Sequence, residues 1–283
     1  MATFYNQATL RFNGLITNSN ITEGELTNTL SAQKTAITGS YNQNDTVSYA
    51  ISLVNGGGTA LTDLTVTDNL GAYTFGTGEL VPLSYIDGSV KLFIDGVLAT
   101  APTVTESPLT FSGIDLPAGS SAVIIYEGAT NLYTPYAEGS LITNTATVTG
   151  GGLAEPIILN ATSTVNTAPI LTIAKAICPE TVGDNGELTY TFVILNHGNA
   201  AADATDDVII TDTFTPILNP ISVTYNGTAW TEGVNYTYDE TTGDFATIAG
   251  NVSVPAATFT QDPVTGAYSV TPGVSVITVT GTV

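Results

Sequence analysis

Apolar and polar residues alternate along much of this chain in short runs with a period of two. The first twelve residues contain one such run, whose apolar side is formed by Phe4, Asn6, Ala8, Leu10 and Phe12. The stretch LITNTATVTG repeats the pattern, with Asn144 in the place of Asn6. A period of two is typical of strands that bury one face. Because turn-forming NGG, DG and PAG separate the runs and no long segment has helical periodicity, the chain is predicted to be all-β.

Segments of the chain repeat at a nearly constant spacing. DTVSYAISLVNGG matches GELTYTFVILNHG, and LTVTD ending at Asp68 matches VIITD ending at Asp212. Lys34 and Lys175 occupy equivalent positions, 141 residues apart. The chain therefore consists of two tandem copies of one β domain. We predict an arm at residues 1–26, domain one at 27–150, a linker at 151–168 and domain two at 169–283.

The two copies end differently. The second copy stops at TPGVSVITVTGTV and has no counterpart of LITNTATVTG, whereas NQATL in the arm matches NTATV of that strand. Asn6 lies 28 positions before Lys34, and Asn144 lies 31 positions before Lys175. A second alignment uses LITNSNIT and puts Asn18 in the place of Asn6. The NG pair in the arm also fits a hairpin turn.

Three destinations are open to the arm. If it pairs with domain one of its own chain, domain two keeps an open edge, which natural proteins avoid. If it pairs with its own domain two, it must pass a whole domain. The third destination is domain two of a neighbouring copy, by donor-strand addition. Such a head-to-tail contact gives an open filament unless the rotation closes, so we predict a self-assembling homopolymer.

Polar residues interrupt the apolar faces of the strands at equivalent positions in both copies. The predicted trios are Lys34, Asp68 and Asn144 within domain one, and Lys175, Asp212 and the neighbouring copy's Asn6. Burial favours a neutral lysine amine, which is a nucleophile, and a protonated carboxyl group, which can polarise an amide carbonyl. Attack of the amine on the asparagine amide would release ammonia and leave an isopeptide bond. This is a single self-directed reaction, and the chain is not predicted to be an enzyme.

Other interpretations of these residues stay open. A lysine and an aspartate can form a buried ion pair with the asparagine hydrogen-bonded to it. Asp68 and Asp212 also stand at strand ends, where aspartate commonly begins a turn. In domain one, Glu127 follows Val123 and Ile125 on what we expect to be the inward side, which makes it a second candidate acid.

Charge and composition exclude several classes of function. The chain has 4 basic and 25 acidic residues, a net charge of -21, whereas nucleic-acid and anionic-lipid binding need basic patches. No run approaches the roughly 20 apolar residues of a membrane span, and the first residues lack the pattern of a signal peptide. The one cysteine, Cys178, is expected to be a partly buried free thiol.

Candidate sites for other chemistry are weak. The one histidine, His197, is expected in a turn. The acidic loops DATDD and GDNGE lack the full ligand spacing of a calcium site, so no cofactor or metal is predicted beyond weak Ca²⁺ binding. The stretch at residues 225–243 holds the one tryptophan and three tyrosines. It makes a monomeric adhesin or carbohydrate-binding module the alternative function.

Several phrases, among them DTVSYAISLVNGG, LTVTDNLGAY, GELTYTFVILNHGN and ITNTATVTG, resemble the conserved-repeat family of bacterial surface domains, catalogued as domain of unknown function eleven. The opening NQATLRFNG resembles an arm found in Firmicutes, chiefly clostridial, members. The resemblance implies Ig-like or transthyretin-like β-sandwiches with a structural role on the cell or spore surface. Related sandwiches in Gram-positive pilins and adhesins carry internal Lys–Asn bonds. On that pattern Lys34, Asp68 and Asn144 match in domain one, and Lys175 and Asp212 match in domain two.

Overall fold

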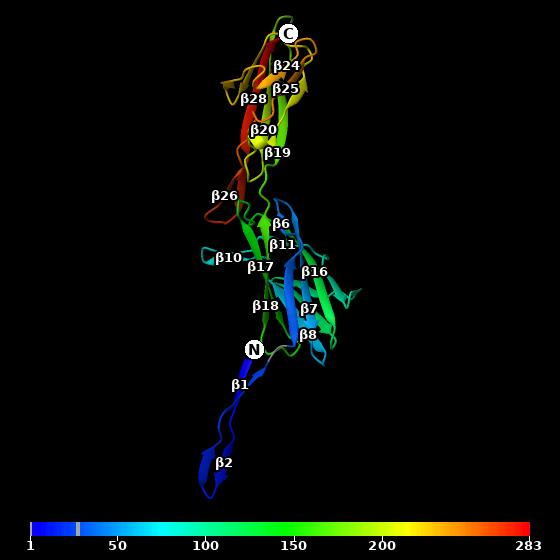
Figure 1. The fold of residues 1–283 in the computed structure, drawn as a ribbon, viewed down its shortest axis with the longest axis vertical. Coiled ribbons are helices and arrows are strands. Elements are labelled where there is room, and N and C mark those ends of the chain that lie inside the picture. The colour runs from blue at the N-terminus through cyan, green and yellow to red at the C-terminus, as the bar shows by residue number, and fades with distance from the viewer. Residues whose placement is uncertain (1, 27–28) are drawn as a thin grey trace. The chain divides into compact units, whose positions relative to one another are not determined.

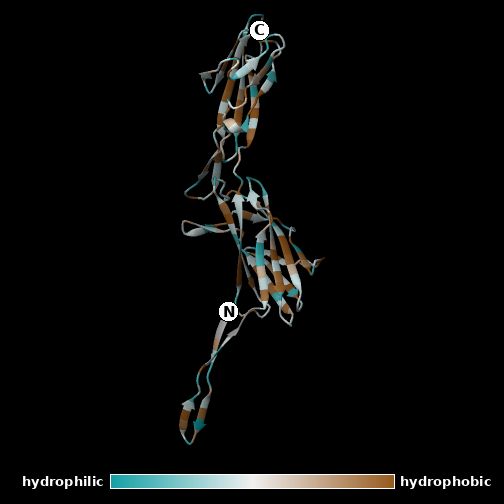
Figure 2. Cartoon of the chain, viewed as in Figure 1, coloured by the Kyte–Doolittle hydropathy of each residue, from teal (hydrophilic) through white to brown (hydrophobic). Residues whose placement is uncertain are grey.

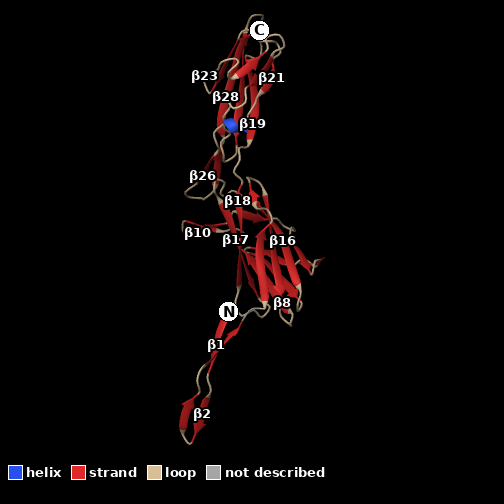
Figure 3. Cartoon of the chain, in the orientation of Figure 1, coloured by secondary structure: helices blue, strands red, loops and turns tan. Residues whose placement is uncertain are grey.

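The computed structural model describes residues 2–26 and 29–283, and it is all-β, as predicted (Figures 1 and 3). The one helix among these residues is a single 3₁₀ turn, η1 (Ala204–Asp206). The strands form two compact units, residues 1–135 with 141–164 and residues 136–140 with 165–283. Each has two facing sheets and is a β-sandwich.

No helix in the part of the chain that the structure describes is long and apolar enough to span a membrane.

The arm folds into a long hairpin. Strand β1 (Ala2–Asn6) pairs with β4 (Thr22–Leu26), and β2 (Thr9–Phe12) pairs with β3 (Leu15–Asn18). The two central residues of the turn have positive φ, 48° at Asn13 and 82° at Gly14. This is the backbone of a type I′ turn, whose twist matches that of the flanking strands. The hairpin turn predicted from the NG pair is therefore confirmed.

The first sandwich is built from two six-stranded sheets. One has the order β13-β12-β16-β7-β5 with β11 paired to β16, and the other has the order β14-β15-β8-β17-β18-β6. A small hairpin, β9–β10, is separate. The strands are β5 (Leu30–Ala36), β6 (Ser40–Tyr41), β7 (Thr46–Asn55), β8 (Leu61–Asp68), β9 (Tyr73–Phe75), β10 (Gly78–Leu80), β11 (Leu83–Tyr85), β12 (Lys91–Ile94), β13 (Val97–Leu98), β14 (Thr103–Glu106), β15 (Leu109–Leu116), β16 (Ser121–Thr130), β17 (Leu141–Thr149) and β18 (Ile157–Val165).

Strand β18 lies within residues 151–168, the segment that we expected to be a linker. It pairs with β17 from Leu141 opposite Thr164 to Val148 opposite Ile157. Its alternate residues are buried: Leu159, Ala161, Ser163 and Val165. LITNTATVTG is consequently not the final strand of the first unit, and the first unit extends to Thr164.

The second sandwich has a five-stranded sheet, called the complete sheet below, and a three-stranded sheet, called the short sheet. The complete sheet has the order β19-β20-β28-β22-β23, and the short one has three strands, β21-β25-β24. A hairpin, β26–β27, is separate. The strands are β19 (Leu171–Cys178), β20 (Glu187–Asn196), β21 (Thr211–Thr213), β22 (Ile221–Tyr225), β23 (Thr228–Ala229), β24 (Tyr236–Tyr238), β25 (Asp244–Thr247), β26 (Thr258–Gln261), β27 (Tyr268–Thr271) and β28 (Gly273–Thr282).

Each core follows the period of two. Along β7, Tyr49, Ile51 and Leu53 are fully buried, and along the equivalent β20 the buried residues are Tyr190, Phe192 and Ile194. Hydrophobic residues mark the strands of both units and also the arm hairpin (Figure 2). The arm differs in that its apolar side chains are exposed, for example 56% at Phe4 and 67% at Phe12.

Candidate cross-linking sites

In the first sandwich, Lys34 and Asp68 meet between the two sheets. Lys34 projects from β5, and Asp68 is the last residue of β8. Lys34 Nζ lies 2.5 Å from Asp68 Oδ2, and both side chains are fully shielded from solvent. The ammonium group also lies 4.9 Å from the centre of the Tyr49 ring and 5.8 Å from that of Tyr126. The predicted meeting of Lys34 and Asp68 is therefore present in the structure.

Asn144 reaches this pair through a tyrosine. The Tyr126 hydroxyl donates a hydrogen bond to Asp68 Oδ2, and Asn144 Nδ2 donates one to the Tyr126 hydroxyl over 3.3 Å. Asn144 is fully buried, and its carbonyl oxygen Oδ1 accepts no hydrogen bond from the described residues. A buried acceptor without a donor is costly, and it leaves that carbonyl free for an acid.

The two carboxylate oxygens of Asp68 have different partners. Oδ2 faces Lys34 and Tyr126, whereas Oδ1 accepts a hydrogen bond from the backbone N–H of Leu70 over 2.9 Å. The second contact is the turn-starting role of aspartate. The ion pair and the turn are thus both present, and neither excludes the other.

Burial shifts the proton affinities of this cluster. It lowers the pKa of Lys34 from 10.5 to about 8, although Asp68 opposes the shift. Burial, followed by the charge of Asp68, raises the pKa of Tyr126 well above its ordinary range. Burial also raises the pKa of Tyr49 to about 12. Lys34 therefore loses its proton far more readily than an exposed lysine, while both tyrosines stay protonated.

Glu127 is not part of the cluster, and our assignment of its face was wrong. In β16 the buried residues are Ala122, Ile124 and Tyr126, so Glu127 points to the other side of the sheet. There it lies 3.5 Å from the Ser48 hydroxyl. Because we assigned the wrong set of alternate residues in β16 to the buried face, the sequence analysis also missed Tyr126. Its alternation with Ala122 and Ile124 is the signal that locates it.

The equivalent pair in the second sandwich is more open. Lys175 of β19 and Asp212 of β21 form an ion pair, but their side chains are 39% and 19% exposed. Lys175 Nζ lies 4.4 Å from the centre of the Tyr190 ring, and the equivalent distance from Lys34 Nζ to the Tyr49 ring is 4.9 Å. The hydroxyl of Tyr126 has no counterpart at the equivalent position of the second sandwich. Tyr126 lies opposite Tyr49 in the first sandwich, whereas Val279 lies opposite Tyr190 in the second.

The openness follows from the sheet that faces Lys175. In the first sandwich β8 lies between two neighbours, so Asp68 has Leu109 of β15 on one side and Ala146 of β17 on the other. In the second sandwich β21 pairs with β25, which places Phe245 opposite Asp212. No other strand of the described residues pairs with β21. The position beside β21 that corresponds to the position of β17 in the first sandwich is therefore unoccupied by the described residues.

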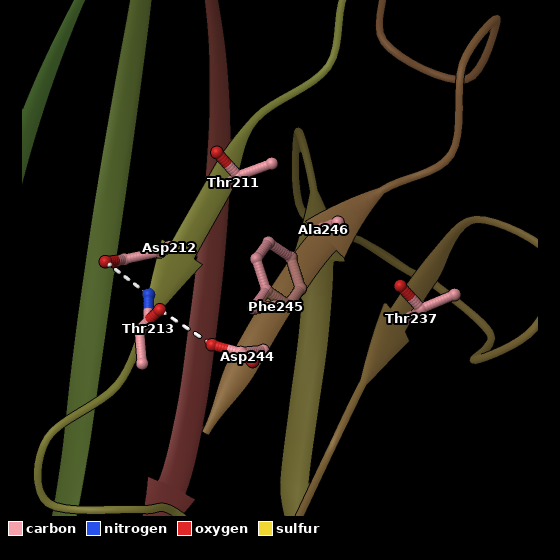
Figure 4. Close-up of a pocket in the computed structure, with 7 residues that line it drawn as sticks. All are labelled: Thr211, Asp212, Thr213, Thr237, Asp244, Phe245 and Ala246. Carbon is pink, nitrogen blue, oxygen red and sulfur yellow. Dashed lines mark hydrogen bonds between the residues drawn. The ribbon is translucent and has the colours of Figure 1, made fainter. Parts of the chain in front are cut away.

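Figure 4 shows how the polar groups of β21 are arranged at this edge. The backbone N–H of Thr213 donates a hydrogen bond to Asp212 Oδ1, and its hydroxyl donates one to Asp244 of β25. Across the sandwich, Ile173 and Ile177 of β19 are 56% and 38% exposed. These residues share the inward side of β19 with Lys175, so the apolar face there is uncovered.

Asn6 and Asn18 both lie in the arm hairpin. Asn6 ends β1 opposite Thr22, and Asn18 ends β3 opposite Thr9, whose hydroxyl donates a hydrogen bond to Asn18 Oδ1. Both asparagines are exposed. The pairing of either with Lys175 of another copy stays a prediction.

The aromatic stretch considered as a sugar platform is largely part of the second core. Tyr236 and Tyr238 are 5% and 9% exposed and pack with Phe245 and Phe214. Trp230 is half-buried and stacks on Tyr225 with 4.9 Å between ring centres. These contacts favour a packing role for the stretch.

Cys178 and the acidic loop DATDD are the two remaining features for which we made a prediction from the sequence. Cys178 is exposed, so the expectation of a partly buried thiol was wrong. In DATDD, Asp203 accepts a hydrogen bond from the N–H of Thr205, and Asp206 accepts one from the N–H of Asp203. These carboxylates cap η1. Weak Ca²⁺ binding remains a prediction.

No family model matches the chain, and no curated protein matches it. The resemblance to the conserved-repeat family therefore stays a prediction.

Among solved structures, the pilus backbone RrgB from Streptococcus pneumoniae aligns over 86% of this chain and 55% of that one, with 12% identity and a TM-score of 0.36. The collagen adhesin CNA from S. aureus aligns over 52% and 55%, with 10% identity and a TM-score of 0.31. A family 123 glycoside hydrolase from Clostridium perfringens aligns over 49% and 27%, with 12% identity and a TM-score of 0.31. In these three cases the chain spans about half of the other chain or less. At such identities and scores these matches assign neither a fold nor a function to this chain.

Proposed function

We propose that the chain is the structural subunit of a self-assembling extracellular filament, pilus-like or a spore appendage. In this filament, the arm of one copy completes the second sandwich of the next copy. Lys–Asn isopeptide bonds then reinforce both the first sandwich and the junction. The observation that carries the proposal is the free edge of β21 beside Lys175 and Asp212, where the first sandwich has β17 with Asn144.

The arm has the residues that such an edge needs. Its NQATL matches NTATV of β17, so Asn6 would take the place of Asn144. Its apolar side chains, among them Phe4, Leu10 and Phe12, are exposed in the single chain. Burying each of them at a junction would contribute roughly 1.5–3 kcal/mol. A strand edge left unpaired favours association with another chain.

The cluster in the first sandwich supports the bond chemistry. Proton transfer from the Lys34 ammonium to Asp68 leaves a neutral amine, whose nitrogen attacks Cγ of Asn144. The Asp68 carboxyl polarises the Asn144 carbonyl and gives its proton to the leaving nitrogen, and it takes back the proton that the attacking nitrogen releases. The bond from Cγ to the side-chain nitrogen breaks, and that nitrogen departs as ammonia. An amide between Nζ and Cγ remains, and the chain is lighter by one ammonia.

At the junction the same reaction requires two copies. Lys175 and Asp212 are already paired, and the arriving strand would supply both the amide of Asn6 and the cover that removes water from the pair. The reaction at the junction would then depend on docking. The cross-link would form only after the arm is seated, so a correct junction precedes its covalent bond.

A boiled denaturing gel and the intact mass of the purified chain test the proposal. Concentrated protein should give a ladder of multimers that survives boiling, with each chain in the ladder lighter by ammonia. Asn6→Ala should abolish the ladder. Asn18→Ala, a matched change in the same hairpin, should leave it intact. If the wild-type chain remains a monomer at every concentration, the filament proposal is wrong and a monomeric adhesin becomes the better interpretation.

A further inference from the structure

The strand that carries Asn144 belongs to a hairpin. Strand β17 is followed by β18, and Asn144 lies opposite Ala161. In the arm, Asn6 lies opposite Thr22. The two partners are 17 positions apart in the first case (161 minus 144) and 16 in the second (22 minus 6). The arm hairpin and the β17–β18 hairpin therefore have nearly the same size around their asparagines.

Strand β18 is needed to close the first sandwich. Its inward residues are buried, Ala161 to 7% exposure and Ser163 fully. The Ser163 hydroxyl donates a hydrogen bond to the Thr38 carbonyl, and the Thr164 N–H donates one to the Gly39 carbonyl. These contacts join β18 to the chain just after β5, which carries Lys34. Without β18, that side of the sandwich would be open to water.

The second sandwich lacks both strands among the described residues. In its short sheet, β21 and β25 are the counterparts of β8 and β15, and among the described residues no strand pairs with β21 on the side that β17 occupies beside β8. A single donated strand would fill the place of β17 and leave the place of β18 empty. Lys175, which is 39% exposed, lies on β19, and the chain after β19 would then lack the contacts that β18 makes with the chain after β5.

We infer that each copy donates its whole arm hairpin, with β1–β2 taking the place of β17 and β3–β4 taking the place of β18. This inference rests on the proposed function and specifies what enters the junction. The occupant is the arm of a second copy of this chain, and it enters as a preformed two-stranded unit.

The β17–β18 hairpin also sets the register of docking. Because Ala146 lies opposite Asp68 and Asn144 is two residues earlier, Ala8 lies opposite Asp212 when Asn6 takes the place of Asn144. Leu10 then lies opposite Ile210, as Val148 lies opposite Val66.

The register of the hairpin also separates the two arm asparagines. In a regular strand, alternate residues share a face, so Asn6 and Ala8 face Lys175 while Thr9 faces away. Asn18 pairs with Thr9 and therefore lies on the outer face. Of the two asparagines, Asn6 is the one that the hairpin presents to the lysine.

An intact hairpin is also the less costly form to dock. Opening it would break the β1–β4 and β2–β3 ladders and leave the backbone groups of the second half unpaired. A preformed unit loses less conformational entropy on binding than a flexible strand. The outer edge of β3–β4 then becomes the edge of the completed sheet.

A reversible lock on the hairpin tests this inference in the full chain. Thr9 and Asn18 form a non-hydrogen-bonded pair, because they are the third pair beyond Phe12 and Leu15, which flank the two-residue turn. Side chains of such pairs lie close enough for a disulfide. The test variant is Thr9→Cys/Asn18→Cys in a Cys178→Ser background, with each single cysteine as a control. A second lock, Arg11→Cys/Ile16→Cys, uses the next such pair toward the turn.

Assembly is carried out with the lock closed or reduced, and every sample is then boiled with reductant so that only isopeptide ladders remain. If the hairpin is donated whole, the locked chain loses none of the ladder, and its Asn6–Lys175 linkage is as abundant as in the reduced chain. A ladder that forms only after reduction overturns the inference, because it requires the hairpin to open. If neither form makes a ladder although the parent chain does, the two cysteine substitutions themselves prevent assembly. The same comparison of closed and reduced forms is then made with the second lock. Failure of the parent chain as well would instead contradict the proposed function.

Discussion

Lys34 Nζ lies 2.5 Å from Asp68 Oδ2 with both side chains inaccessible to water, whereas the equivalent Lys175 and Asp212 are paired but 39% and 19% exposed. The sequence around the two pairs is similar, so the difference arises from their neighbours. Asp68 has Ala146 of β17 beside it, and Asp212 has no such neighbour among the described strands. The first pair is covered within its own unit, and the second pair is open on the side where the first has β17.

Preventing the bond within the first sandwich should change both mass and stability. The wild-type monomer should be lighter by one ammonia, and Asn144→Ala should restore the full mass. The bond closes a loop of 110 positions (144 minus 34), and loops of that size are worth about 4–5 kcal/mol when cross-linked. Asn144→Ala should therefore lower the free energy of unfolding by roughly that amount, measured by chemical denaturation.

Asn160→Ala is the matched control for this change. Asn160 lies on the exposed side of β18, where it accepts a hydrogen bond from Thr145, so its loss should cost less than about 1 kcal/mol and leave the mass deficit unchanged. A wild-type monomer of full mass would mean that Lys34 and Asp68 remain a buried ion pair and no bond forms.

The uncross-linked variant should become more stable as the pH rises from about 8 to 10. In Asn144→Ala, Lys34 keeps its amine, and its folded pKa of about 8 lies below the ordinary 10.5. Between these values the unfolded chain binds more protons than the folded chain, so the free energy of unfolding rises with pH. The upper limit of the rise is roughly 3 kcal/mol, at 1.36 kcal/mol per pH unit.

Above pH 10 the trend should reverse in the same variant. Tyr49, with its pKa raised to about 12, and Tyr126 hold their protons in the folded chain after the unfolded chain has lost them. Stability then falls with rising pH. Denaturation curves at several pH values measure both parts, and adding Lys34→Met and Asp68→Asn should remove the rise. A rise that persists without Lys34 would show that another group causes it.

Tyr126→Phe should slow bond formation in the first sandwich without affecting the junction. Its hydroxyl links Asp68 to Asn144, and a hydrogen bond to a charged group contributes about 1.5–3 kcal/mol. The rate after refolding should fall about 10- to 100-fold, followed as ammonia loss by mass spectrometry. Since Val279 replaces Tyr126 in the second sandwich, the ladder should be unchanged. Equal slowing of both reactions would contradict a positioning role for Tyr126 at the first site.

The two lysines should be separable by substitution. Lys175→Met should remove the boiling-resistant ladder and retain the loss of one ammonia per monomer. Lys34→Met should retain the ladder and lose the internal deficit. Electron microscopy should still show filaments of Lys175→Met, because strand pairing does not require the bond, but they should dissociate on boiling. If Lys175→Met leaves the ladder intact, the junction is linked through another residue.

Much of this architecture was predictable from the pattern of residues. The period of two gave the strands of both cores, and the repeat around Lys34 and Lys175 gave two equivalent domains. Asp68 and Lys34 form the contact that we predicted. Each interrupts the apolar face of a strand, and each has an equivalent residue in the second copy. The NG pair was a sufficient signal for the turn of the arm.

The rest depended on features that one sequence does not reveal. Strand β18 is separated from β17 by a glycine-rich loop, and its polar and small residues, such as Ser163, resemble a linker until the burial of alternate positions is known. Tyr126 was missed because an uninterrupted apolar run fits either phase of a strand, and the wrong phase turned Glu127 inward. The exposure of Lys175 was also hidden, since its sequence neighbours match those of Lys34.

The most direct test of the proposed filament is to find the bond between copies. Chains grown in ¹⁴N and ¹⁵N are mixed, assembled, boiled and digested, and the peptides that contain Lys175 are analysed by mass spectrometry. We expect a peptide in which Asn6 is joined to Lys175 and which is lighter by one ammonia. In part of this material one half carries ¹⁴N and the other ¹⁵N, because the two halves come from different chains. Unmodified Asn6 and Lys175 throughout the assembled material, or a linkage whose halves are never of mixed isotope, would contradict it.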